Sequence, residues 1–221
     1  MPISDAARRT HEELFPGHVS TLARTDPELV ECFDNFAFDE VLRHGSLDAR
    51  TRLMVQLAAL IACQAVGEYR VFDFLHATND VLAERGVELP LPGQSTTTPE
   101  TRYEQGLAVQ KRIAGDERVE ALYASAPEDE QHIQRYLSAN CFGDHLTRDG
   151  LDVPTRELLT FAVLVALGGC DPQVKGHVAA NLNVGNDRAR LIGVLTQLIP
   201  FIGYPRTLNG LRALDEVSPA R

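Results

Sequence analysis

The stretch that most constrains the fold of this chain is the run from Leu158 to Leu167. Only Thr160 interrupts its apolar residues, so a helix here would be apolar on every side and has to be buried, in a large core or in an oligomer interface. Asp152 is a suitable N-cap ahead of the run, and Gly168-Gly169 supplies a stop after it. We therefore expect a buried central helix that begins just after Asp152.

A second helix is predicted directly after this stop. Asp171-Pro172 has the order of a cap and a first-turn proline. His177 would then lie on an otherwise apolar face of the new helix, because its neighbours at helical spacing are valines. Three reactive side chains, Glu157, Cys170 and His177, thus bracket one helix-turn-helix.

The order and spacing of three motifs in this region carry a family resemblance. They are R-E-L-L-T-x-A from Arg156, H-V-x-x-x-L-N-x-G from His177 and G-Y-P-x-x-L-N from Gly203. Together they resemble the carboxymuconolactone decarboxylase family, which includes the alkyl hydroperoxidase D-like proteins. The resemblance covers residues 126–217, and more weakly 26–81. It implies an all-α fold, assembly as trimers or hexamers, and a Glu and a His near a buried cleft.

The chain also repeats itself. Residues 47–63 parallel residues 151–167 at a constant offset of 104, and the preceding segments keep that offset. After Tyr69 the offset becomes 136, so the first copy lacks a segment matching about 171–205. The first copy also has Leu53 where the second has Glu157, which places the chemistry in the second copy.

These observations together predict an all-α helical bundle of two unequal carboxymuconolactone decarboxylase-like repeats, with the alkyl hydroperoxidase D-like fold. The expected organisation is a truncated repeat over residues 1–87, a linker over 88–104 that is rich in Pro, Ser and Thr, and a complete repeat over 105–221.

The composition of the chain argues against several classes of binding partner. The net charge of -10 and pI near 5.1 argue against nucleic acid and anionic membranes. The N-terminus has no apolar stretch of signal-peptide length, so we expect a cytoplasmic protein. The four cysteines lack CxxC or zinc-ligand spacing, so neither a metal nor a disulfide framework is expected.

Each reactive residue has a structural and a chemical interpretation. His177 is a core histidine or, as the resemblance favours, a catalytic or substrate-binding group whose ordinary pKa suits proton transfer. Glu157 interacts with the helix dipole or, if it is buried, serves as a general acid or base. Cys170 is a small buried apolar side chain, or a thiol whose pKa the following helix lowers.

One difference between this chain and the family pattern distinguishes peroxidase chemistry from decarboxylation. The alkyl hydroperoxidase D-like branch uses a Glu, a C-x-x-C pair and a His in a disulfide relay. Here Cys170 stands in the first cysteine position of that pair, but Gln173 stands in the second, so a peroxidase of this kind would need an external thiol. Decarboxylase members do not need the pair, and they resemble this chain also in the turn Cys141-Phe142-Gly143-Asp144.

We therefore expect a lyase that acts by acid/base chemistry on a small cyclic carboxylated lactone, without a cofactor and as a homo-oligomer. His177 would move the proton, and Glu157 would hold its tautomer or relay through water. Arg156, Lys175 or a neighbouring subunit's Arg52 would bind the carboxylate. Three alternatives remain open: a related isomerisation of a cyclic acid, a peroxidase that uses a single cysteine and an external thiol, and a non-catalytic oligomeric binding protein. Asp144 is a weaker substrate-binding candidate, because a solvated helix end explains it equally well.

Overall fold

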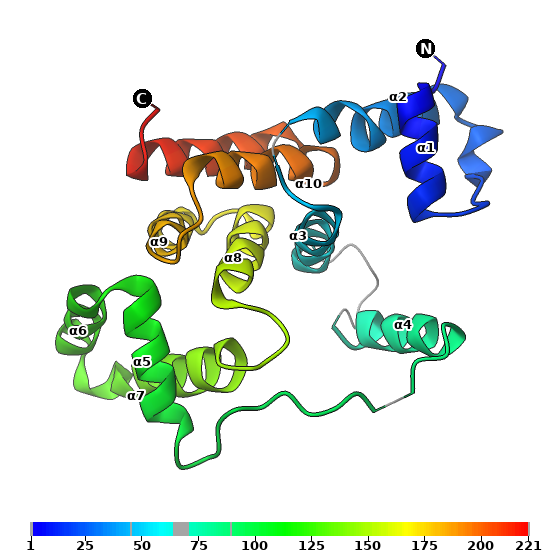
Figure 1. Cartoon of the computed structure of the whole chain (residues 1–221). Coiled ribbons are helices and arrows are strands. Elements are labelled where there is room, and N and C mark those ends of the chain that lie inside the picture. Colours follow the sequence, from blue (N-terminus) through cyan, green and yellow to red (C-terminus); the bar gives the residue numbers. More distant parts are fainter. Residues whose placement is uncertain (1, 45, 64–70, 89, 221) are drawn as a thin grey trace.

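The structure is a computed structural model that describes residues 2–44, 46–63, 71–88 and 90–220. All regular structure in these residues is helical, which confirms the predicted all-α class. Short 3-10 turns and one π-helix join the α-helices. The α-helices (Figure 1) are α1 Asp5–Leu14, α2 Pro27–Phe38, α3 Ala49–Ala62, α4 Val71–Glu84, α5 Arg102–Ala114, α6 Asp116–Ser125, α7 Gln131–Tyr136, α8 Val153–Leu167, α9 Asp171–Asn183 and α10 Arg188–Val217.

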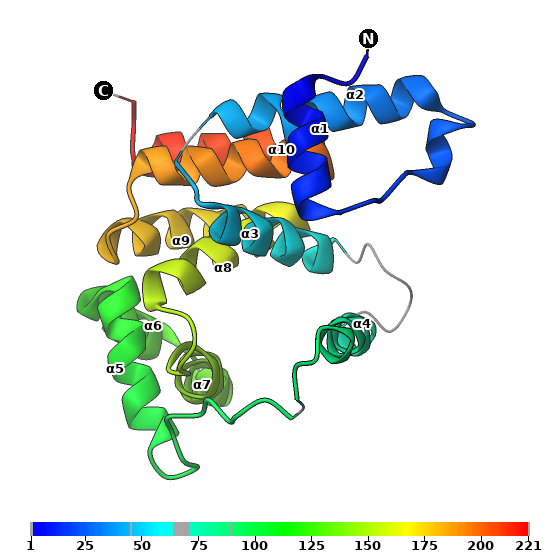
Figure 2. The ribbon, with the colours of Figure 1, turned by 45° about the vertical axis from the view of Figure 1, so that its right-hand side comes forward.

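Helix α8 is the centre of the core, as its composition predicts. Its side chains at Leu158, Phe161 and Ala162 are fully buried. Helices α3, α9 and α10 pack around it and contribute buried aliphatic side chains to the same cluster. Figure 2 shows α3 and α8 side by side beneath α10. A helix that is apolar on nearly every side is therefore surrounded on several sides by helices of its own chain.

Helix α10 contains a sharp bend. Gly203 has φ 72° and ψ 171°, which is non-helical, and Pro200 and Pro205 lie on either side of it. A proline inside a helix removes a backbone hydrogen bond, and the positive φ is one that glycine adopts without strain. The predicted Gly-Tyr-Pro motif is thus a hinge between two helical segments.

The helices α3 and α8, which the sequence offset of 104 relates, begin in the same way. Asp48 Oδ1 accepts a hydrogen bond from Thr51 N at 3.0 Å, and Asp152 Oδ1 accepts one from Thr155 N at 2.8 Å. The equal caps agree with the offset. The duplication itself stays a prediction, and residues 64–70, where the offset changes, lie outside the described residues.

A π-helix, Leu137–Leu146, follows α7 and packs closely against α5. The backbones approach so closely that a Cβ on Gly106 would lie 2.0 Å from Ser138 O. A Cβ on Gly143 would lie 2.2 Å from Arg102 O. Glycine is therefore required at both contact points, and the contact fixes the position of the π-helix, which leads to α8.

The predicted linker is attached to this π-helix at its C-terminal end. Thr97 Oγ1 donates to Gly143 O at 3.1 Å, and Thr96 Oγ1 donates to Thr147 O at 2.9 Å. Asp149 N also donates to Gln94 O at 3.0 Å. Residues 94–97 therefore run along the surface of the second half of the chain. None of the described helices is both long and apolar enough to cross a bilayer.

Candidate active site

Two side chains predicted from the sequence meet between α8 and α9. His177 Nδ1 lies 2.8 Å from Glu157 Oε2. The Glu157 side chain is fully buried, whereas the His177 side chain is 27% exposed. Because a carboxylate can only accept a hydrogen bond, His177 Nδ1 carries the proton in this contact, which leaves Nε2 as the nitrogen able to act on another molecule.

The second carboxylate oxygen of Glu157, Oε1, has no hydrogen-bond partner among the described residues, which is unusual for a buried polar atom. A buried polar atom without a partner costs free energy, and such atoms concentrate where function requires them. The unpaired Oε1 makes Glu157 a candidate functional residue.

A buried asparagine braces the pair, and the sequence interpretation missed it. Asn181 Nδ2 donates to His177 O at 2.7 Å and to Glu157 O at 3.1 Å. Asn186 Nδ2 in turn donates to Asn181 Oδ1 at 2.8 Å and to Pro154 O at 2.9 Å. Both asparagines are buried. The position of Asn181 one helical turn after His177 was the available signal, because a polar residue on a buried helix face needs partners, whereas Asn186 lies after the end of α9.

Cys170 does not have the environment of a reactive thiol. Its Sγ donates to Leu164 O at 3.1 Å, in the last turn of α8. Burial and then the negative charge of Asp171 raise the pKa of the Cys170 thiol. The alternative in which the following helix lowers this pKa is therefore wrong in direction, since desolvation and the nearby carboxylate prevail.

Besides burial, the negative charge of Glu157 affects the pKa of a second cysteine, Cys141. Partial desolvation raises the pKa of Cys141, and the Glu157 carboxylate raises it further. Cys141 belongs to the π-helix. Cys141 is therefore the residue of the predicted turn Cys141-Phe142-Gly143-Asp144 that senses the charge of Glu157.

The residues predicted to bind substrate have partners within the chain. Arg156 donates to Leu151 O, Arg148 O and Asp149 O, at 2.8 to 3.0 Å. Burial and then the charge of Arg148 lower the pKa of Arg156. Arg156 therefore braces the segment that leads into α8.

Lys175 forms an ion pair with Glu216 of α10, and Asp144 forms one with Arg102 at 2.7 Å. Arg52 lines a small pocket with residues of α1, α2 and α10, among them Leu14, Phe38 and Phe201. No residue of α8 or α9 is among the lining residues of that pocket.

Comparison with known proteins gives two matches. The carboxymuconolactone decarboxylase family model matches residues 131–216, a region that contains both Glu157 and His177. The chain is also 30% identical, over 118 residues, to a 4-carboxymuconolactone decarboxylase of Acinetobacter baylyi. That alignment covers 53% of this chain and 87% of the relative.

Proposed function

This chain belongs to the carboxymuconolactone decarboxylase family, and from this premise we propose that it is a lyase that decarboxylates a small cyclic carboxylated lactone by acid/base chemistry. The observation that carries the proposal is the contact between Glu157 Oε2 and His177 Nδ1. It joins a fully buried carboxylate to a partly exposed imidazole. This is the arrangement that proton transfer to a bound substrate needs.

In the proposed reaction the substrate accommodates the electron pair, and the protein supplies the proton. The bond between a ring carbon and the carboxylate breaks, carbon dioxide leaves, and the electron pair passes into conjugation with the lactone carbonyl. A proton must then reach carbon. His177 in its protonated form delivers that proton from Nε2, and the Glu157 carboxylate stabilises the imidazolium before delivery and holds the neutral tautomer afterwards. Because His177 is the exposed member of the pair, it recovers its proton from solvent.

The substrate carboxylate needs a cationic partner in a chain with a net charge of -10. Arg156 and Lys175 are held by partners within the chain. This favours Arg52 of a neighbouring subunit, and it makes the proposed homo-oligomer, a trimer or a hexamer, part of the proposed site.

The raised pKa of Cys170 disfavours the alternative of a single-cysteine peroxidase, because only the thiolate attacks peroxide. The fold offers no comparable argument against a non-catalytic binding protein, so activity has to be measured directly.

The test is turnover of 4-carboxymuconolactone by the purified chain, followed through release of carbon dioxide. We expect His177→Gln to lower kcat by about a hundred- to ten-thousand-fold, the usual contribution of general acid/base catalysis. The matched control is His132→Gln, since His132 lies at the surface of α7 against Tyr136. Normal turnover in His177→Gln contradicts the mechanism, and absence of turnover in the natural chain contradicts this substrate class.

A further inference from the structure

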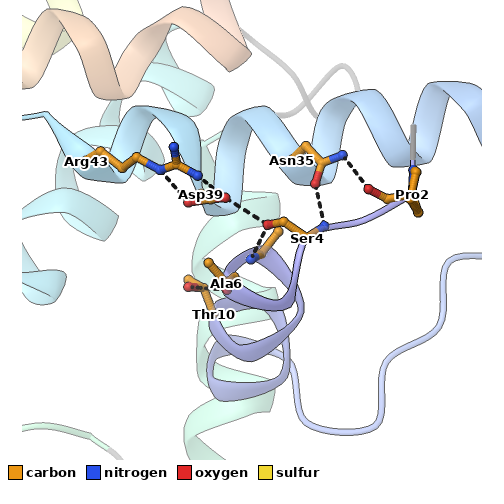
Figure 3. Close-up of polar contacts among 8 residues, drawn as sticks. Pro2, Ser4, Ala6, Thr10, Asn35, Asp39 and Arg43 are labelled. Carbon is orange, nitrogen blue, oxygen red and sulfur yellow. Dashed lines mark hydrogen bonds and ion pairs between the residues drawn. The ribbon is translucent and has the colours of Figure 1, made fainter.

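The N-terminal segment contains a second candidate site, outside the family-matched residues 131–216. Helix α1 is clamped onto α2 by Ser4, whose N donates to Asn35 Oδ1 at 2.7 Å and whose Oγ donates to Asp39 Oδ2 at 2.8 Å (Figure 3). Arg43 holds Asp39 from the other side. The clamp fixes α1 across α2, which brings His11 of α1 against Asp34 of α2.

Three ionisable side chains form a chain of contacts there. His11 Nδ1 lies 3.5 Å from Asp34 Oδ2, and His11 Nε2 lies 3.3 Å from His18 Nδ1. Asp34 is only 7% exposed. The His11 ring stacks on Phe38, with centroids 5.0 Å apart and planes 3° apart. His11 thus faces Asp34 with Nδ1 and His18 with Nε2, so His18 Nε2 is the end of the chain of contacts.

This chain of contacts lies at the wall of an apolar cavity of about 460 Å³. We call it the N-terminal cavity; its lining includes His11, Phe15, His18, Phe33, Asp34 and Phe38. Its volume lies within the range of roughly 300 to 1,000 Å³ typical of small-molecule sites. Phe15 is 48% exposed and Phe33 40% exposed, so a bound molecule would remove apolar surface from water.

A polar cavity lies on the other side of the same residues. It shares His11, His18 and Asp34 with the N-terminal cavity, and its other charged lining residues are Arg8, Arg9, Glu12 and Glu13. A ligand that places an apolar body in the N-terminal cavity would therefore meet His18 and His11 at the point where charged residues of both signs replace the apolar wall.

We propose that the N-terminal cavity binds a small apolar organic acid, an aryl or alkyl carboxylic acid, whose acidic group pairs with His18 and is supported through His11 by Asp34. The aromatic and aliphatic walls accommodate the apolar body. The carboxylate of the ligand accepts a hydrogen bond from His18 Nε2–H, and the buried Asp34 carboxylate faces His11 at the other end of the contacts. This site is independent of the proposed decarboxylase site.

The test uses two probes of the same shape, 2-naphthoate and 2-naphthamide, titrated into the full chain by calorimetry and by probe fluorescence. The chain contains no tryptophan, so naphthalene emission has no indole background. We expect 2-naphthoate to bind about tenfold or more tightly than the amide, which corresponds to one charge-assisted hydrogen bond. Equal binding of the two probes, or no binding of either, overturns the proposal.

Variants of the lining residues then test whether the probes bind in the N-terminal cavity. His18→Ala should weaken 2-naphthoate binding about tenfold or more and leave the amide within about twofold. Phe33→Ala should weaken both probes, because it removes part of the apolar wall. The exposed His132 provides a matched control in His132→Ala, which should change neither affinity. If His18→Ala loses its circular dichroism signal, His18→Gln serves instead.

His177→Gln separates this proposal from the proposed catalytic function. We expect it to bind 2-naphthoate normally even where it has lost turnover. Binding that disappears in His177→Gln and persists in His18→Ala places the probe at the other site and overturns the inference.

Discussion

Glu157 Oε2 of α8 lies 2.8 Å from His177 Nδ1 of α9, and the two residues are twenty positions apart in the chain. The relationship is asymmetric, because Glu157 is fully buried and His177 is partly exposed. One residue can therefore exchange protons with substrate and solvent while the other acts only through it. The predictions for the site follow from this division.

Glu157→Gln is expected to separate activity from stability. Glutamine keeps the volume and a hydrogen bond to His177, but it removes the charge that stabilises protonated His177, so kcat should fall by about ten- to a hundredfold. The free energy of unfolding should stay the same or increase, because a buried charge no longer has to be desolvated. Steady-state kinetics and urea unfolding measure the two effects.

Glu216→Gln is the control for this variant, since Glu216 is half exposed and pairs with Lys175. A fall in kcat as large as that of His177→Gln would make Glu157 itself the acid or base. Unchanged kcat in Glu157→Gln would remove it from the mechanism.

Asn181→Ala tests the brace between the helices. Asn181 is buried and donates to Glu157 O and His177 O, and its loss removes one of the two acceptors of the Asn186 amide. We expect a loss of about 1 to 3 kcal/mol in the free energy of unfolding. Gln173→Ala, at an exposed position on the same helix, should cost less than about 1 kcal/mol. Equal effects of the two variants in urea unfolding would contradict the bracing role.

Cys170→Ser should leave most of the decarboxylase turnover intact. The thiol donates to Leu164 O, and its raised pKa keeps the thiolate fraction low near neutral pH. In the natural chain, iodoacetamide should therefore label Cys170 more slowly than the exposed Cys32, as measured by peptide mass spectrometry. Loss of all activity in a folded Cys170→Ser, or faster labelling of Cys170, would favour thiol chemistry instead.

The parts of the fold that local signals determine were predictable from the sequence. The side chains of Asp48 and Asp152 cap the N-termini of α3 and α8, which begin directly after them. The burial of α8 follows from its composition alone. The π-helix was not predictable, because its shift from the α-helical hydrogen-bond pattern has no comparable sequence signature and depends here on close contact with α5 at Gly106.

Of the candidate site, too, one part could be predicted from the sequence and another part could not. The sequence pattern and the family resemblance identified Glu157 and His177, and the structure brings them into contact. The substrate-binding roles of Arg156, Lys175, Arg52 and Asp144 stay predictions. Whether a cation is free or bound to a carbonyl or carboxylate depends on tertiary contacts, and Arg156 and Lys175 both have such partners. Asn181 was missed because its donors act on backbone carbonyls, which no side-chain motif encodes.

Assembly is a further prediction. Exposed apolar side chains remain on several helices, including Leu53 and Leu57 one turn apart on α3 and Leu208 on α10. We expect light scattering at micromolar concentration to give three or six times the 24.3 kDa chain mass. Leu57→Asp should lower that mass, and Val87→Asp, at an exposed position after α4, should not. A monomeric natural chain would contradict the proposed shared site.

The N-cap of α8 should give the free energy of unfolding a defined pH dependence. Hydrogen bonds from the Thr155 side chain and then from its backbone N–H lower the pKa of Asp152 below its ordinary value of 3.8. A lowered folded-state pKa means that the stabilisation is fully present above the unfolded-state value and is lost as pH falls through the folded-state value. At pH 7, Asp152→Ala should therefore reduce the free energy of unfolding by about 0.5 to 2 kcal/mol, as for other N-caps.

Below the ordinary value of 3.8, the natural chain should progressively lose this advantage over Asp152→Ala, because Asp152 becomes protonated in the folded state as well. Urea unfolding of both proteins across that pH range measures the difference. Asp149→Ala, an exposed aspartate in the loop before the helix, is the control and should show little difference at either pH. A difference between natural chain and Asp152→Ala that stays constant or grows on acidification would show that the carboxylate does not act as the cap.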